Sequence, residues 1–218
     1  MPSPHRSITA LPTVMLILTA MALAGPAGAH HPMGGAVPAT IWQGLLSGIG
    51  HPLIEFEHLL FLLAAGLAAA LAPLSNRSAV IMLLIYAGAG AVGTAWHVTG
   101  AVVPMVDMAL AVSLLVVAMW LWTRSRPGAI LGALCTAAAG FFHGYAYGEA
   151  VLGAETSPVV AYLCGLAVIQ SLLMMAVFFA LRRMAFVVYP KPTATTRALA
   201  VFVGASGLWL SWAGNLGT

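Results

Sequence analysis

Residues 50–72, GHPLIEFEHLLFLLAAGLAAALA, place two histidines and two glutamates at the mouth of an apolar run. On insertion scales, a charged side chain at the centre of a bilayer costs about 2.5–3.5 kcal/mol. The whole chain has only five acidic residues. Because two of them, Glu55 and Glu57, stand in this stretch, we expect a specific reason for their position.

The composition of the chain is that of a protein embedded in a membrane. It has 218 residues, of which 61% are hydrophobic and 6% charged, and its mean hydropathy is +1.01. A soluble domain carries about 25% charged residues. A membrane β-barrel would alternate polar and apolar residues, so the sequence predicts an all-α, polytopic helical membrane protein. A net charge of +3 from eight basic residues does not indicate binding to nucleic acid.

The first 29 residues have the three parts of a secretory signal peptide. Arg6 makes the start positive, residues 11–25 are apolar, and small residues end the segment at Ala29. Cleavage there would leave His30 as the first residue of a single transmembrane helical domain, residues 30–218. The alternative is an uncleaved first anchor.

Six apolar segments follow, and prolines, glycines and charged residues separate them. We expect transmembrane helices at residues 53–72, 79–101, 106–123, 128–148, 158–181 and 195–215. Residues 41–50 are too short to cross a bilayer, which needs about 20 apolar residues. They predict a short interfacial or re-entrant helix before the first span. Cys135 and Cys164 lie in apolar runs at different depths, so we expect no disulfide bond.

The basic residues fix an orientation. With the mature N-terminus outside, every basic residue after the signal peptide falls on the cytoplasmic side; these are Arg77, Arg124, Arg126, Arg182, Arg183, Lys191 and Arg197. Cytoplasmic loops are enriched in Lys and Arg. The sequence therefore predicts a multi-pass protein of the bacterial cytoplasmic (inner) membrane, surrounded by the lipid bilayer, with both mature termini in the periplasm.

The same topology gathers histidines and carboxylates in the outer half of the molecule. Candidate metal ligands there are His51, Glu55, Glu57, His58, His97, Asp107 and His143, with His30 and His31 on the outer tail. Ionisable groups within spans usually face the bundle interior and mark ion pathways. Imidazole and carboxylate together suit divalent first-row metals. The alternative is that these side chains lie at the membrane surface, in contact with water, and join neighbouring helices by hydrogen bonds.

The spacing in the opening stretch has two interpretations. On one continuous helix His51, Glu55 and His58 would share a face, because residues three and four apart are neighbours. Pro52 favours the first position of a helix, however, so we expect His51 to be a cap residue with its own direction. Glu55 and Glu57 could instead stand there because a carboxylate near the N-terminus of a helix interacts favourably with the positive end of the helix dipole.

Glycine recurs every fourth residue in the fourth predicted span, at Gly140, Gly144 and Gly148. A row of small residues lets another helix approach closely. His143 and Tyr147 lie one turn apart in the same segment, so the row brings backbone near the candidate site. In the second span the position of His97 beside Trp96 also fits an aromatic pair at the membrane surface.

Three motifs resemble those of the HupE/UreJ family of membrane proteins. HPLIEFEH resembles the family's His-Pro pair followed by an acid-His pair, with Glu57 for the usual Asp and Glu55 where a Gly is common. PMVDMALAVS resembles the third-span motif, with Asp107 for the usual Glu and Ser113 as in the family. HGYAYG resembles the fourth-span motif, with Tyr147 in place of a His.

The resemblance covers essentially the whole mature chain and implies a function. His51, His58 and His143 match histidines of the family, whereas a histidine that members can carry late in the fifth span has no counterpart, and Gln170 is the nearest polar residue. The family is associated with nickel supply to hydrogenase and urease. The resemblance therefore implies a permease, not an enzyme, that imports a divalent cation for a metalloenzyme maturation pathway.

The residues leave the metal open. A cleaved chain would offer the amine and imidazole of His30 beside His31, and thioethers on the outer side, including Met105 and Met108, suit copper. The resemblance to the family makes nickel the first candidate for the bound metal. Copper is the second candidate, followed by cobalt and zinc.

The mode of action is also open. A permease needs polar groups deeper in the membrane, for which the sequence offers Ser113, Gln170, Tyr86 and Ser171. One alternative is a periplasm-facing metal chaperone or receptor that transports nothing. Another is an intramembrane zinc-dependent hydrolase, with a zinc-bound water and a glutamate as base.

Overall fold

The computed structural model describes residues 36–123, 129–183 and 193–214, and every regular element in these ranges is helical. The elements are α2 (Ile41–Ile54), α3 (Phe56–Leu71), α4 (Asn76–Val98), α5 (Val106–Thr123), α6 (Ala129–Tyr147), η2 (Gly148–Val151), α7 (Thr156–Arg183) and α8 (Ala194–Gly214). The predicted all-α class is confirmed. The predicted signal peptide, with His30 and His31, lies outside the described residues.

Each of the six predicted spans coincides with one long helix, from α3 to α8. Among the described residues, α4, α5 and α7 are each long and apolar enough to cross a membrane, and α2 with α3 makes a fourth candidate if this bent pair is one broken span. α8 contains a shorter apolar stretch, Ala194–Leu210. The chain is therefore a multi-pass membrane protein, and six spans remain a prediction.

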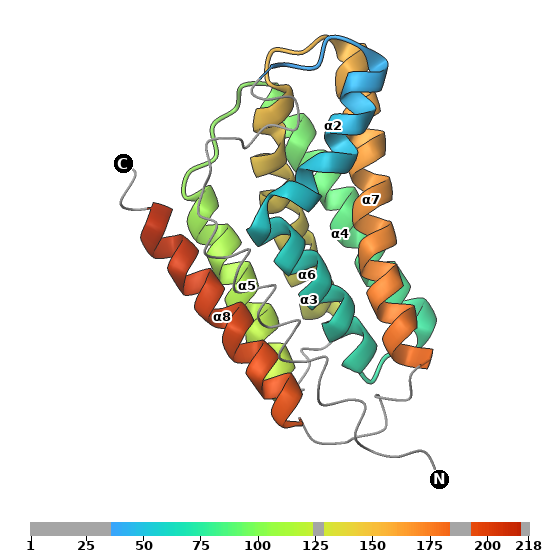
Figure 1. Ribbon diagram of the computed structural model, residues 1–218, viewed down its shortest axis with the longest axis vertical. Coiled ribbons are helices and arrows are strands. Elements are labelled where there is room, and N and C mark those ends of the chain that lie inside the picture. The colour runs from blue at the N-terminus through green and yellow to red at the C-terminus, as the bar shows by residue number, and fades with distance from the viewer. Residues whose placement is uncertain (1–35, 124–128, 184–192, 215–218) are drawn as a thin grey trace.

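The helices pack in pairs around a central segment. α2 lies along α7, α4 along α6, and α5 along α8, while α3 contacts both α7 and α5 (Figure 1). Many side chains of α3 are buried, among them Leu60, Phe61 and Leu62. α3 is thus the helix around which the bundle is built.

Glycines let α4 and α6 approach until their backbones touch. A Cβ atom added to Gly140 would lie 2.3 Å from the carbonyl oxygen of Tyr86, and one added to Gly144 would lie 2.0 Å from that of Gly90. The hydroxyl of Thr94 donates to the carbonyl of Gly144 across the same contact at 2.7 Å. The tight packing predicted for this glycine row is confirmed.

The first helix differs from the sequence prediction. α2 runs on through Pro52 to Ile54, so Pro52 lies inside the helix and His51 in its last turn; the expectation that His51 caps a helix beginning at Pro52 is wrong. α2 follows α7 in the same direction, with Gly44 against the backbone of Pro158 and Gly48 against that of Tyr162. This packing against α7 outweighs the preference of proline for a helix start.

The chain then breaks at Glu55 and bends by 78° between α2 and α3. Glu55 has an extended backbone, with φ −84° and ψ 117°. A proline within a helix removes one hydrogen bond and crowds the preceding turn, which explains why the helix ends shortly after Pro52. The broken helix places Glu55 between two helix ends.

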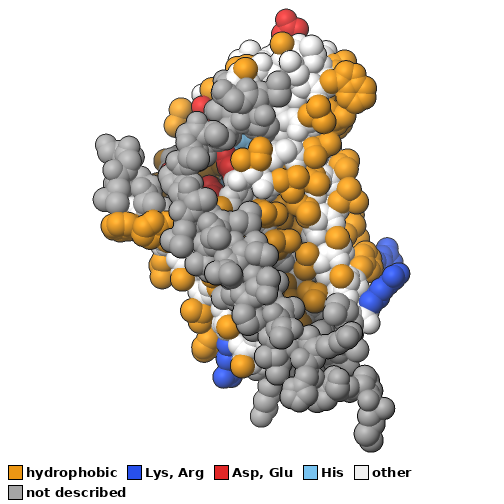
Figure 2. Space-filling view, viewed as in Figure 1, with side chains coloured by type: hydrophobic (Ala, Val, Ile, Leu, Met, Phe, Trp, Pro, Cys, Tyr) orange, Lys and Arg blue, Asp and Glu red, His pale blue; other side chains and the backbone are white. Residues whose placement is uncertain are grey.

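Charges separate along the molecule. In the view of Figure 2 the Lys and Arg side chains lie toward the lower end, and the Asp and Glu side chains lie in the upper half. Nη2 of Arg182, near the end of α7, donates to the carbonyls of Ala72 and Leu74 at 2.9 Å and so ties α7 to the turn after α3. Three basic residues of the predicted cytoplasmic loops, Arg124, Arg126 and Lys191, lie outside the described residues.

Candidate metal site

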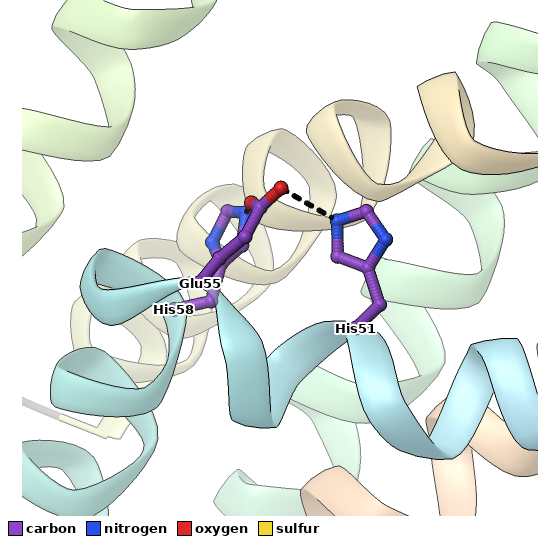
Figure 3. A group of neighbouring side chains, drawn as sticks. All are labelled: His51, Glu55 and His58. Atoms are coloured by element: carbon purple, nitrogen blue, oxygen red, sulfur yellow. Dashed lines mark ion pairs between the residues drawn. The ribbon is translucent and has the colours of Figure 1, made fainter. Parts of the chain in front are cut away.

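The break between α2 and α3 brings three side chains together. The carboxylate of Glu55 lies between two imidazoles: its Oε1 is 3.1 Å from Nε2 of His51 and its Oε2 is 2.8 Å from Nε2 of His58 (Figure 3). Each residue offers one ligand atom within 4.8 Å of the other two. We call these three residues the break cluster.

The break cluster is shielded from solvent. His51 is 2% exposed and His58 1%, while the side chain of Glu55 keeps 13%. The ring of Tyr147 packs 4.2 Å from that of His58 and 5.2 Å from that of His51, centroid to centroid. Tyr162 fixes the position of Tyr147, because its hydroxyl donates to the carbonyl of Tyr147 at 2.8 Å. We call Tyr147 and Tyr162 the aromatic wall of the break cluster.

A chain of hydrogen bonds leads from the break cluster into the bundle. Nδ1 of His58 lies 2.9 Å from Nδ1 of His143 on α6, and Nε2 of His143 lies 2.9 Å from the hydroxyl of Ser113 on α5. That hydroxyl also donates to the carbonyl of Leu110 at 2.6 Å. His143 is fully buried, so three helices meet through one polar line.

The break cluster fits a transition-metal ion. Two imidazole nitrogens and a carboxylate are ligands that zinc, copper and nickel accept, at about 2.0–2.2 Å for zinc. Ligands at that distance around one ion stand about 3–3.5 Å apart by tetrahedral geometry. The two carboxylate–imidazole contacts, at 3.1 and 2.8 Å, are close to that separation. Nδ1 of His51 makes no hydrogen bond within the described part of the chain.

The other predicted residues lie elsewhere. Glu57 and Asp107 do not belong to the group of close ligand atoms found among the described residues, and Asp107 is exposed. His97 forms a separate pair: its Nδ1 contacts the carbonyl of Tyr145 at 2.8 Å, and its Nε2 lies 3.2 Å from the exposed carboxylate of Glu149.

Sequence reasoning missed the aromatic wall. Tyr162 has no motif that marks it, and only contact with α2 gives it a place beside His51. Tyr147 could be found, because it lies one turn after His143. The helical wheel places Glu55 near His58, but no sequence pattern predicts the bend that puts Glu55 at the centre of the site.

A second feature lies beneath the break cluster. An apolar cavity of about 270 Å³ extends between α3, α4, α5 and α6, and it begins at Phe61, Tyr86 and Ser113. It continues along α3 to Ala72 and along α5 to Trp120. The bundle therefore contains a hydrophobic space between the break cluster and the end of the molecule that carries the basic side chains.

Comparison with known proteins identifies a family. Residues 18–210 match the family model described as HupE / UreJ protein. Neither the curated proteins nor the solved structures yield a match. Since the matched range covers most of the chain, and the three motifs quoted above fall within it, the chain belongs to the HupE/UreJ family.

Proposed function

We propose that this protein is a permease of the bacterial inner membrane that imports a divalent transition-metal ion, with nickel as its substrate. The observation that carries the proposal is the break cluster, in which Glu55 joins His51 and His58 at the interruption of a helix. The ion binds there from the periplasmic side. His30 and His31 on the outer tail would offer it earlier ligands.

The helix break favours transport over a structural role. Many transporters bind their substrate near the middle of the membrane, where a helix is discontinuous and its ends face the ion. Here α2 has 14 residues and spans about 21 Å along α7 before it breaks. The C-terminal end of a helix carries partial negative charge, so the end of α2 also favours a cation.

The donor set narrows the choice of metal. Magnesium and calcium prefer oxygen ligands, whereas two imidazoles favour nickel, copper, cobalt or zinc. The chain belongs to the HupE/UreJ family, and nickel is preferred because the resemblance to that family implies nickel supply to hydrogenase or urease. We propose accordingly that the imported ion enters the maturation pathway of such a metalloenzyme.

Four polar side chains are available for passage inward, namely Ser113, Gln170, Tyr86 and Ser171, and Gln170 is the strongest candidate. Gln170 on α7 is fully buried, and neither atom of its carboxamide has a hydrogen-bond partner among the described residues. Its Oε1 faces Gly90 on α4. A buried polar group without a partner costs about 1–3 kcal/mol, so we propose that Gln170 meets the ion or its water during passage.

The apolar cavity favours a second candidate function. A space lined mainly by apolar side chains does not stabilise a dehydrated divalent cation, because burial of an unpaired charge is costly. A periplasm-facing receptor or chaperone would bind the ion at the same ligands and transport nothing. The two functions differ in the fate of the ion, not in the site.

The test is a metal-accumulation panel in cells that lack other nickel uptake. Cells expressing the wild-type chain, His58→Ala or Ser206→Ala receive nickel, cobalt, copper or zinc in turn. We expect the wild type and the Ser206→Ala control to accumulate nickel, and His58→Ala to fall to the level of cells without the protein. Binding without accumulation in the wild type would indicate a receptor instead, and turnover of a lipid or peptide with retained zinc would indicate a hydrolase.

A further inference from the structure

We propose that His143 and Ser113 act on the ion through His58, as a relay that fixes which ring nitrogen of His58 the ion meets. The inference rests on the proposed function, because it assumes that the break cluster binds the ion. It makes His143 a positioning residue, although the sequence placed it among the ligands. The relay consists of His58, His143, Ser113 and the carbonyl of Leu110.

The direction of the relay follows from its last member. The carbonyl of Leu110 can only accept a hydrogen bond, and at 2.6 Å it takes the single hydroxyl proton of Ser113. The oxygen of Ser113 therefore accepts at its contact with Nε2 of His143, 2.9 Å away. Nε2 of His143 must carry a proton.

The same logic sets the proton on His58. A neutral imidazole carries a proton on only one nitrogen, and full burial favours the neutral form of His143 because a buried charge is costly. Nδ1 of His143 is then an acceptor, so Nδ1 of His58 donates to it at 2.9 Å. The other nitrogen of His58, Nε2, faces the carboxylate of Glu55 at 2.8 Å and donates a hydrogen bond to it while no ion is bound. The ion takes the place of that proton, which is released, so the relay at Nδ1 leaves Nε2 as the nitrogen that the ion meets.

A fourth-ligand role for His143 conflicts with this geometry. Both of its nitrogens are engaged, one with His58 and one with Ser113, so binding the ion would break one of these buried contacts. Metal-bound histidines usually donate their second N–H to a neighbour, and loss of that neighbour typically costs about 10–100-fold in metal affinity. With three protein ligands the ion keeps open positions, which favours its release inward.

The experiment uses the purified full-length chain with Cu²⁺ as a spectroscopic probe and Ni²⁺ for affinity. Pulsed electron paramagnetic resonance counts the imidazoles bound to Cu²⁺ and senses the hydrogen bond at the remote nitrogen of each. The variants are Ser113→Ala, Ser113→Thr, His143→Gln and His143→Leu. Ser206→Ala is the matched control, since Ser206 has the same 8% exposure as Ser113 and donates to a carbonyl of its own helix.

The relay predicts a specific pattern. Ser113→Ala and His143→Leu lower Ni²⁺ affinity about 10–100-fold, while Cu²⁺ in both still binds two imidazoles and shows a changed remote-nitrogen signal. Ser113→Thr keeps the hydroxyl and restores affinity, because Ser113 borders the cavity and an added methyl has room. His143→Gln keeps an acceptor for His58 and stays closer to wild type than His143→Leu.

Two results would overturn the relay alone. Loss of one bound imidazole in His143→Gln would make His143 a ligand. Wild-type affinity in both Ser113→Ala and His143→Leu would remove any role for the relay, even with binding that still depends on His58. If the wild-type chain bound neither ion, or His58→Ala bound as well as wild type, the proposed function would fail and the relay with it. Melting curves recorded beside those of Ser206→Ala identify a variant that merely misfolds.

Discussion

Glu55 is the central residue of the break cluster, because its carboxylate contacts both imidazoles. Its two oxygens lie 3.1 Å from His51 and 2.8 Å from His58. The family motif points to the neighbouring acid Glu57 instead, since Glu55 stands where a glycine is common. The structure thus decides between two carboxylates for which the helical wheel and the family motif give opposite answers.

Substitution of each glutamate by glutamine distinguishes them. Glu55→Gln keeps the shape of the side chain and removes the charge that offsets the cation, so we expect Ni²⁺ affinity to fall by about 10–100-fold, as for loss of a charged hydrogen bond of about 1.5–3 kcal/mol. Glu57→Gln should have the smaller effect. Isothermal titration of both purified variants checks this, and a larger loss in Glu57→Gln would move the site toward the family motif.

The helical wheel favours the pairing of Glu55 with His58, whereas the expected cap at His51 set that residue apart from the other two. The wheel puts all three on one face only if the helix is continuous, and the real chain breaks at Glu55. They still meet because Glu55 ends α2 one turn after His51 and begins α3 one turn before His58. In the sequence, Pro52 could mark either the start of a helix or a kink within one. Only the packing of α2 against α7 decides between these two structures.

At the scale of helices, backbone contact between α4 and α6 sets the register of the site. Gly144 touches Gly90 and Gly140 touches Tyr86, and this places His143 where it reaches His58 from a different helix. Hydropathy located these helices from sequence to within a few residues. It could not pair His143 with His58, because pairing depends on which faces touch, and no spacing within one helix records that.

The glycine contact makes a stability prediction. Gly144→Ala would put a Cβ atom 2.0 Å from a backbone oxygen that cannot rotate away, so we expect a loss of about 1–3 kcal/mol, typical of overpacking. Gly88→Ala on α4 is the control, because nothing lies within 4 Å of its added Cβ. Thermal unfolding in detergent should show a lower midpoint for Gly144→Ala only; equal midpoints would contradict the close approach.

Across the whole molecule, the basic side chains lie toward one end of the bundle, and the turn between α6 and α7 lies at the opposite end (Figures 1 and 2). Arg182 and Arg197 belong to helix ends beside the turn after α3 and the start of α8. Since positive charge marks the cytoplasmic side, the turn between α6 and α7 should face the periplasm. In this orientation α2 would lead from the periplasmic side to the break cluster, about 21 Å along its length.

Single cysteines test this orientation. With Cys135 and Cys164, both free thiols, replaced by alanine, Ser157→Cys and Ser78→Cys each place one isosteric thiol on an exposed site at opposite ends. A membrane-impermeant maleimide applied to intact spheroplasts should label Ser157→Cys and spare Ser78→Cys until the membrane is opened. The reverse labelling pattern would mean that the orientation is inverted and that this end of the molecule faces the cytoplasm.

The hydrophobic space below the break cluster also bears on the energy economy of the cell. Cavities lined by apolar side chains stay dry, and a dry constriction blocks ions and water together. In the proposed permease, the space of about 270 Å³ beneath the ligands would be the part of the path that resists leakage of ions. A membrane holding many copies of such a permease would keep its proton gradient, because an ion would cross only when a rearrangement opens that space.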